Sequence, residues 1–318
     1  MANSGFIQKV TIDPEAQAFL DFQSKNNAPN VIDHGVQKTR LANHENLFLA
    51  GPIGTSAEIQ HRYITTPTAD VPVRIYIPKN AEIHGAIAYF HGGGWAFGHI
   101  DRYDSQLVDI SAGTNSVIIS VNYQKSPEHK FPIPLEDCYA ATKWLFENAE
   151  SLNVDKTKIG VCGDSAGATL AAAVAIKARD EKLFKISYQV LMYPPTSLNF
   201  DSESYLRYAT GFGLTREVMI WYWNSYLEEK DWANPYAVVS MCNDLSNLPT
   251  SIVVVPEYDV LRDDTINYAK KLEDAGNQVQ TEFFSGQIHG FFAHAGINKT
   301  SFKLREYLIE SINSLIWR

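Results

Sequence analysis

The sequence has few of the features that mark disulfide-stabilised, metal-binding or membrane-spanning proteins. Its 318 residues include only three cysteines, Cys138, Cys162 and Cys242, and no two of them have the CxxC spacing of a metal or redox site. No apolar run approaches the roughly 20 residues that a helix needs to cross a bilayer. The N-terminus also has no apolar stretch followed by a cleavage site. These absences predict a cytoplasmic protein with reduced, buried thiols and no membrane span.

Basic runs and low-complexity tracts are absent as well. Acidic residues outnumber basic ones by 36 to 27, and the formal net charge of −9 argues against nucleic acid or an anionic membrane as the main partner. No group of His, Cys and Asp residues has the spacing of a metal site. The run GVCGDSAG lacks the G-x-G-x-x-G spacing of a dinucleotide-binding loop. The sequence therefore predicts neither a metal site nor a nucleotide cofactor.

What the sequence does contain is an alternation of short apolar runs and helical patterns. Nearly continuous apolar runs, typical of strands covered on both faces of a parallel sheet, lie at 85–90, 116–123, 158–163, 188–193 and 251–259. A run with alternating polarity at 71–78 predicts a half-buried strand. Helical patterns lie at 102–114, 134–152, 166–180, 265–276 and 302–317. The alternation predicts an α/β fold with a mostly parallel central sheet flanked by helices.

Two segments interrupt this alternation. Residues 1–50 have the pattern of two polar amphipathic helices before the first strand, and residues 195–230 form a long, aromatic-rich insertion. Such an insertion between two strands is usually a lid or a binding element, although a helix that merely packs on the body is the alternative. The predicted organisation is therefore N-terminal helices at 1–50, a body at 51–194 and 231–318, and an inserted segment at 195–230.

The motif GDSAG, residues 163–167, is the strongest candidate for chemistry. It follows an apolar strand and opens an alanine-rich helix, which is the setting in which a G-x-S-x-G motif presents a nucleophile. Gly163 and Gly167 carry no Cβ, so strand and helix can approach each other on either side of the turn. The helix N-terminus would direct its N–H groups and positive dipole towards charge that develops near Ser165. We predict that Ser165 is a nucleophile; a serine that only caps the helix is the alternative.

A serine nucleophile needs a base and an orienting acid. His289, in the run FFSGQIHGFF, lies between the expected last strand and the C-terminal helix, and His294 is the second candidate. Asp259 directly follows the apolar run ending in PEY, so it is expected at the carboxyl end of a parallel strand, where active sites of such sheets gather. Glu257 and Asp263 are the alternatives for the acid. The resulting chain order is serine, acid, histidine.

Three consecutive glycines follow the expected strand at 85–90. Ester hydrolysis passes through a tetrahedral oxyanion, and hydrogen-bond donors must already point at it. Glycines at a strand end can turn their N–H groups inward because they carry no Cβ that would clash. We predict an oxyanion hole formed by the N–H groups of Gly93, Gly94 and Ala166, with His91 and Gly92 supporting the loop.

At this point the chain resembles the hormone-sensitive-lipase family of α/β-hydrolases, also called bacterial family IV esterases. The blocks that resemble the family, in chain order, are FHGGGWAFG, VNYQKSPEHKFPIPLEDCYAA, GDSAG, EYDVLRDD and IHGF. They cover most of the chain from about Val71 onward. Two departures stand out: Ala168 replaces a glycine of many relatives, and Gln124-Lys125-Ser126 replaces the more usual Arg-Leu-Ala. Neither departure touches the expected triad.

The resemblance implies an α/β-hydrolase fold with a helical cap formed by the N-terminal helices and the insertion. It implies a carboxylesterase that needs no cofactor, acts on a small-molecule ester and forms a homodimer in some relatives. Ser165 would attack, His289 would carry the proton and Asp259 would hold the imidazolium. The bulky insertion predicts a confined pocket for short acyl groups. The residues expected to line this pocket are Trp95, Tyr205, Phe212 and Trp221.

Two alternatives stay open from the sequence. The same triad could cleave an amide, a thioester or a long-chain lipid instead of a short-chain ester. The body could also be a small-molecule receptor without activity, as in the gibberellin receptors, which resemble this family and have lost the histidine. The block IHGF retains His289, which favours the enzyme.

Overall fold

A single eight-stranded sheet forms the centre of the protein in the computed structural model, which describes residues 11–26, 28–79 and 82–317. The strand order is β1-β2-β4-β3-β5-β6-β7-β8; β1 and β2 are antiparallel to their neighbours, and β3 to β8 are all parallel. The strand bounds are β1 Ala57–Thr65, β2 Asp70–Pro78, β3 His84–Phe90, β4 Ser116–Val121, β5 Val154–Asp164, β6 Tyr188–Met192, β7 Thr250–Tyr258 and β8 Val279–Ile288. The predicted mostly parallel sheet is confirmed.

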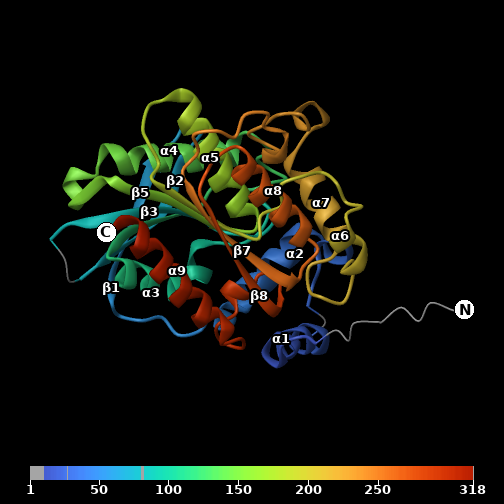
Figure 1. Ribbon diagram of the computed structural model, residues 1–318. Helices are drawn as coiled ribbons and strands as arrows, with labels where there is room; N and C mark the ends of the chain where they lie inside the picture. Colours follow the sequence, from blue (N-terminus) through green and yellow to red (C-terminus); the bar gives the residue numbers. More distant parts are fainter. Residues whose placement is uncertain (1–10, 27, 80–81, 318) are drawn as a thin grey trace, which may run out of the picture.

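Helices cover both faces of the sheet (Figure 1). On one face lie α3 Asp104–Thr114 and α9 Thr300–Ile316; on the other lie α4 Ile133–Glu147, α5 Ala166–Glu181 and α8 Arg262–Asp274. This cover explains why every residue of the central strands β3, β4 and β6 is buried. Strand β1 lies at the edge and is largely exposed, and its polar sequence gave no strand prediction. Within the described ranges, no helix has both the length and the apolar character required to span a membrane.

Four further helices gather at the end of the sheet where the parallel strands finish (Figure 1). They are α1 Pro14–Lys25, α2 Val31–Glu45, α6 Glu203–Arg207 and α7 Arg216–Tyr226. The first two belong to the predicted segment 1–50, of which residues 1–10 lie outside the described residues, and the last two belong to the predicted insertion 195–230. Short 3₁₀ helices complete the fold at η1 Leu47–Ala50, η2 Ile100–Tyr103, η3 Glu150–Leu152, η4 Glu229–Asp231, η5 Val239–Met241 and η6 Phe291–Ala293.

Arg40 fastens α2 to the body. Its guanidinium binds both carboxylate oxygens of Glu128 at 2.8 Å and donates to the carbonyls of Ala96 and Ser126 at 3.0 Å each. A planar guanidinium with paired contacts of this kind fixes orientation as well as distance. Since Ala96 lies in the loop that follows the three glycines, α2 is held directly beside the predicted oxyanion loop.

Candidate active site

The three residues predicted as a triad each follow a parallel strand. Ser165 comes directly after β5, Asp259 directly after β7 and His289 directly after β8. Because these strands are parallel, their carboxyl ends lie at one edge of the sheet. Residues separated by up to 124 positions in the chain therefore meet at a single place.

At this place the three side chains form a continuous line of hydrogen bonds. His289 Nε2 lies 2.9 Å from Ser165 Oγ, and His289 Nδ1 lies 2.7 Å from Asp259 Oδ2. The other carboxylate oxygen of Asp259, which is 1% exposed, accepts the N–H of Leu261 at 2.9 Å. The acid is thus held from both sides, and the imidazole is held between acid and hydroxyl. This is the geometry in which a histidine can take the proton of a serine.

Ser165 lies on a strained turn. Its backbone angles are φ 53° and ψ −125°, a conformation that a non-glycine residue rarely adopts and that surrounding structure must enforce. Its N–H donates to the carbonyl of Met192 at 2.8 Å. A Cβ on Gly163 would collide with the backbone of Gly167, and one on Gly167 would collide with the carbonyl of Phe90. Both glycines of the motif are therefore required by close backbone approach, as predicted.

The loop after β3 presents free backbone donors to the same place. No described residue accepts a hydrogen bond from the N–H of Gly93, Gly94 or Ala166. Gly93 and Gly94 have φ of +121° and +58°, which only glycine adopts readily. A Cβ on Gly94 would also overlap the ring of Tyr222 from α7. The loop thus combines unpaired N–H groups with contact to the inserted segment.

Asp164, which the sequence analysis did not single out, holds this loop from below. Its buried carboxylate accepts the N–H of Gly92 at 2.8 Å and the hydroxyls of Tyr89 at 2.6 Å and Tyr103 at 3.0 Å. Burial raises the pKa of Asp164, and these three donors oppose the rise. The two tyrosines lie 75 and 61 residues away from Asp164. Sequence spacing alone could not show this support.

His91 also contacts the loop rather than the triad. Its Nδ1 lies 2.8 Å from the carbonyl of Gly92, and its ring stacks on Tyr123 at 4.4 Å. The hydroxyl of Tyr123 donates to the carbonyl of His91 at 2.8 Å. Burial holds the pKa of His91 well below its ordinary value, so the ring is neutral at physiological pH. The supporting role of His91 stays a prediction, and these are the contacts through which it would act.

The alternative acids and the alternative base have other partners. Glu257 accepts the hydroxyl of Ser285 at 2.7 Å and the N–H of Gly286 at 2.8 Å. Asp263 accepts the N–H of Ser204 at 2.8 Å and pairs with the neighbouring Arg262 at 3.2 Å. His294 is buried, and its ring stacks on Phe19 of α1 at 3.7 Å. The structure therefore brings only Asp259 and His289, among the candidates weighed, into line with Ser165.

The predicted pocket residues need correction. Ser165 and His289 border a cavity of about 150 Å³ whose lining includes the apolar side chains of Phe97, Leu214, Tyr222 and Ala293. It adjoins a cavity of about 280 Å³ against α1 and α2. The residues expected there lie elsewhere: Trp95 is buried against Trp223 and Tyr226, Tyr205 is fully buried beside Phe200, Phe212 stacks on Tyr258, and Trp221 lies beside Phe97 outside the lining. These aromatics pack the inserted segment onto the body.

The departure at 124–126 has local partners. Gln124 donates from its side chain to Thr68 at 2.7 Å, and the Lys125 ammonium donates to Asn122 Oδ1 at 2.6 Å and to the carbonyl of Tyr123 at 3.1 Å. Burial lowers the pKa of Lys125 to about 8. The carbonyl of Ser126 accepts from Arg40, as described above. These contacts thus support the segment that carries Tyr123, beneath the predicted oxyanion loop.

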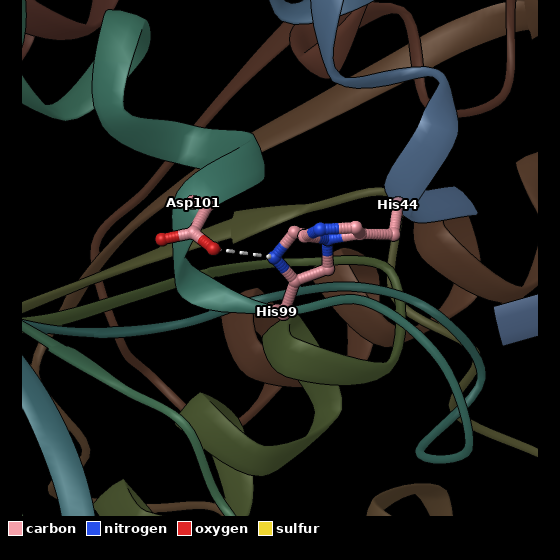
Figure 2. A group of neighbouring side chains, drawn as sticks. All are labelled: His44, His99 and Asp101. Carbon is pink, nitrogen blue, oxygen red and sulfur yellow. Dashed lines mark hydrogen bonds and ion pairs between the residues drawn. The ribbon is translucent and has the colours of Figure 1, made fainter. Parts of the chain in front are cut away.

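One group of side chains in the described part of the chain could hold a metal ion: His44, His99 and Asp101 (Figure 2). His44 Nδ1 lies 3.4 Å from His99 Nε2, and His99 Nδ1 lies 3.3 Å from Asp101 Oδ2. One possible ligand atom from each residue lies within 4.8 Å of the other two. The ligand atoms of a tetrahedral zinc site lie roughly 3.3 Å apart, so a separation of up to 4.8 Å also fits side chains that hold no metal. Arg74 also binds Asp101, at 2.5 Å. In this geometry the group joins α2 to the loop after β3.

Sequence analysis missed this group because His44 is 55 residues from His99. Only the short H-x-D spacing of His99 and Asp101 is visible in the chain, and such a pair is common without a metal. The contact between α2 and the loop is what brings the third residue near.

Comparison with known proteins gives a consistent result. A family model described as alpha/beta hydrolase fold matches residues 87–293. The chain is 36% identical over 282 residues to an arylesterase of Saccharolobus solfataricus, covering 88% of this chain and 92% of the relative. It is 31% identical over 271 residues to the esterase LipI of Mycobacterium tuberculosis, covering 84% of each.

Solved structures are similar over nearly the whole chain. A hyperthermophilic esterase from the archaeon Pyrobaculum calidifontis has a TM-score of 0.89 at 32% identity, covering 96% of this chain and 98% of that one. The ester-hydrolase EH1AB1 from the metagenome of Lake Arreo has a TM-score of 0.90 at 28% identity, covering 95% and 98%. With 95% to 96% of this chain covered, the similarity extends well beyond the matched motifs.

Proposed function

The chain belongs to the hormone-sensitive-lipase-like carboxylic ester hydrolases of the α/β-hydrolase fold, and we propose that it cleaves small esters through an acyl-enzyme intermediate on Ser165. One observation carries the proposal: His289 lies within hydrogen-bond distance of both the Ser165 hydroxyl, at 2.9 Å, and the Asp259 carboxylate, at 2.7 Å. A serine so placed is activated as a nucleophile.

In the proposed reaction His289 Nε2 takes the hydroxyl proton while Ser165 Oγ forms a bond to the ester carbonyl carbon. The carbonyl oxygen becomes an oxyanion and accepts hydrogen bonds from the free backbone N–H groups of the glycine loop and the start of α5. The imidazolium, held by Asp259, then gives its proton to the alcohol oxygen as the C–O bond breaks. Water attacks the acyl-enzyme in the same way, releasing the carboxylic acid and restoring the serine.

We expect replacement of Gly94 by alanine to lower kcat/KM for p-nitrophenyl butyrate by about 100-fold, the order of magnitude for loss of one oxyanion donor. The added Cβ would overlap the ring of Tyr222, and a φ of +58° disfavours a side chain, so the loop must move. Steady-state kinetics on the purified variant measures the effect.

Gly211→Ala is the matched control for Gly94→Ala. Gly211 has a φ of +87° but no atom within 4 Å of an added Cβ, so this variant carries the backbone strain without the collision. We expect it to keep kcat/KM within about twofold of the unchanged protein. Equal losses in the two variants would mean that strain alone, and not donor position, explains the effect.

We also propose that the N-terminal helices up to residue 50 and the insertion at 195–230 act as a cap over the site, with the rest of the chain as the catalytic body. Three features support this division. Helices α1, α2, α6 and α7 lie at the edge of the sheet that carries the triad (Figure 1). Leu214 and Tyr222 of the insertion border the cavity at Ser165. Arg40 ties α2 to the loop beside it.

The confined cavity predicts a preference for short acyl chains. We expect kcat/KM for p-nitrophenyl acetate and butyrate to exceed that for palmitate by at least about tenfold, because cavities of about 150 and 280 Å³ leave little room for a long chain. A panel of p-nitrophenyl esters from acetyl to palmitoyl, run beside the matching anilides, measures this preference. Faster cleavage of palmitate or of the anilides would instead favour a lipase or an amidase with the same triad.

A further inference from the structure

Arg102 is a positively charged residue at the cavity that the proposed reaction does not use. It lies on η2 and borders both the cavity at Ser165 and the adjoining cavity against α1 and α2. Across the described ranges, no side chain or carbonyl accepts a hydrogen bond from its guanidinium, and no carboxylate lies within ion-pair distance of it. No nitrogen of this guanidinium is both buried and unpartnered, so the group reaches solvent, where a ligand in the cavity can contact it.

The acidic residues next to Arg102 in the chain are taken by a different cation. Asp101 lies 2.5 Å from Arg74, and Asp104 lies 2.6 Å from the same guanidinium. Asp104 also accepts the hydroxyl of Tyr76 at 2.6 Å. The two carboxylates on either side of Arg102 therefore contact β2 beneath the loop and leave the Arg102 charge unpaired.

The other titratable groups described above at this cavity make no hydrogen bond or ion pair with Arg102. Asp164 accepts three hydrogen bonds from Tyr89, Tyr103 and Gly92 and is buried beneath the loop. Burial, with a smaller contribution from the Arg102 charge, holds the pKa of His294 well below its ordinary value, so this ring is neutral. His289 is engaged by the acid and the hydroxyl of the triad. Among the described residues that border the cavity at Ser165, Arg102 is thus the one arginine or lysine.

We infer that Arg102 binds a carboxylate carried by the ester substrate, so that the enzyme selects small anionic esters. The inference rests on the proposed function, because it names the substrate class for the same site. A guanidinium binds a carboxylate through two parallel hydrogen bonds, which is the contact that Arg102 lacks within the protein. Since one cavity of about 150 Å³ borders both Ser165 and Arg102, the spacer between ester carbonyl and carboxylate is short.

The overall charge of the protein makes this local cation significant. With a net charge of −9, the chain repels anions on average, and a neutral cavity would disfavour an anionic ester. An arginine without a protein partner at the cavity adds a local attraction for an anion there. The carboxylate can be on the acyl side, as in a half-ester of a dicarboxylic acid, or on the alcohol side, as in an acylated hydroxybenzoate.

The test compares charged and neutral esters of similar size. Mono(p-nitrophenyl) glutarate is paired with p-nitrophenyl butyrate for the acyl side, and 4-acetoxybenzoate with phenyl acetate for the alcohol side. For each pair, the measured quantity is kcat/KM for the anionic ester divided by kcat/KM for the neutral ester. We expect Arg102→Gln to lower this ratio about 10- to 100-fold in at least one pair, as for loss of a charged hydrogen bond. The fall should lie in KM, and Arg102→Lys should recover part of it.

Arg62→Gln is the control for the change in net charge. Arg62 is exposed on the edge strand β1, away from the cavity lining, so the ratio should stay unchanged in this variant. An equal fall in kcat/KM for both members of each pair in Arg102→Gln, or no change in any ratio, would overturn the inference.

Binding without turnover separates this inference from the proposed function. Calorimetry with monomethyl glutarate and with 4-acetoxybenzoate is run on Ser165→Ala and on Ser165→Ala combined with Arg102→Gln. We expect the second substitution to weaken binding of at least one of them about 10- to 100-fold. If the unchanged protein hydrolysed none of the esters, the proposed function alone would be contradicted. If the two variants bound these ligands with equal affinity, the role of Arg102 alone would be contradicted.

Discussion

Replacement of Ser165 by alanine is expected to lower kcat for p-nitrophenyl butyrate by about 10⁴- to 10⁶-fold. The hydroxyl is the only group of this side chain that contacts His289, and without it no acyl-enzyme can form. The fold should persist, because the strained turn depends on the backbone bond from Ser165 to Met192 and on the two flanking glycines rather than on Oγ. Residual turnover near pH 8, measured with a large excess of enzyme, gives the size of the loss.

Covalent labelling gives a second measurement on the same variant. A fluorophosphonate probe reacts only with an activated serine, so it should modify the unchanged protein at residue 165 and leave Ser165→Ala unmodified. Ser151→Ala serves as control, because this exposed serine in η3 bonds only to the carbonyl of Asn148. Labelling of Ser165→Ala at another residue would place the nucleophile elsewhere. Absence of labelling in the unchanged protein would favour a receptor.

Replacement of Asp259 by asparagine should lower kcat by about 10⁴-fold while leaving the fold intact. The carboxylate accepts from His289 Nδ1 at 2.7 Å and so holds the ring with Nε2 free to take the serine proton. An amide that presents its NH₂ group to this nitrogen favours the wrong tautomer, and it carries no charge to stabilise the imidazolium. Steady-state kinetics, with circular dichroism as a check on folding, measures the loss.

Glu257→Gln is the matched control for Asp259→Asn. Glu257 lies two residues earlier, at the end of the same strand, but its carboxylate binds Ser285 and Gly286 of β8. We expect this variant to keep kcat within about threefold. If Glu257→Gln lost as much activity as Asp259→Asn, the histidine would be oriented by a wider acidic network than the one described.

The sequence was sufficient to predict that the three candidate residues meet because each was expected just after a strand. Ser165 and Asp259 follow nearly continuous apolar runs, whereas His289 follows β8, most of which is only partly buried or exposed. In a parallel sheet, residues that follow strands share an edge whatever their separation in the chain. The positions of the expected strand ends were thus enough to predict a shared location for Ser165, Asp259 and His289. The strand at the edge, β1, was not predicted, because an exposed strand has no apolar run to mark it.

The pocket was harder to predict for a geometric reason. Successive residues on a helix point about 100° apart, so Trp221 and Tyr222 of α7 face different surroundings although both are large aromatics. Both rings contact Phe97, but Tyr222 also lies over Gly94 and borders the cavity, whereas Trp221 stays outside the cavity lining. Which of the two faces the site depends on the rotation of α7 against the body. Composition alone does not fix that rotation.

Arg102 was missed for a related reason. Two acidic residues next to it in the sequence suggest a paired, ordinary surface arginine. In the fold, however, both carboxylates bind Arg74 of β2, which is 27 residues from Asp101 and 30 residues from Asp104 in the chain. Neither carboxylate therefore pairs with Arg102. The free charge at the cavity is therefore a property of the sheet order, in which β2 pairs with β4 rather than with β3.

The contact of Tyr222 with Gly94 has a consequence for how selectivity can change. The residues of the proposed triad directly follow strands of the central sheet, whereas Tyr222 belongs to α7, a helix outside the sheet, and its ring contacts Gly94 and Phe97. Smaller residues at 222 would enlarge the acyl space without altering the spacing of hydroxyl, imidazole and carboxylate. Directed evolution toward esters of bulkier acids should therefore begin at α7. Substitutions in this helix can change substrate choice without changing the strands that position the three side chains.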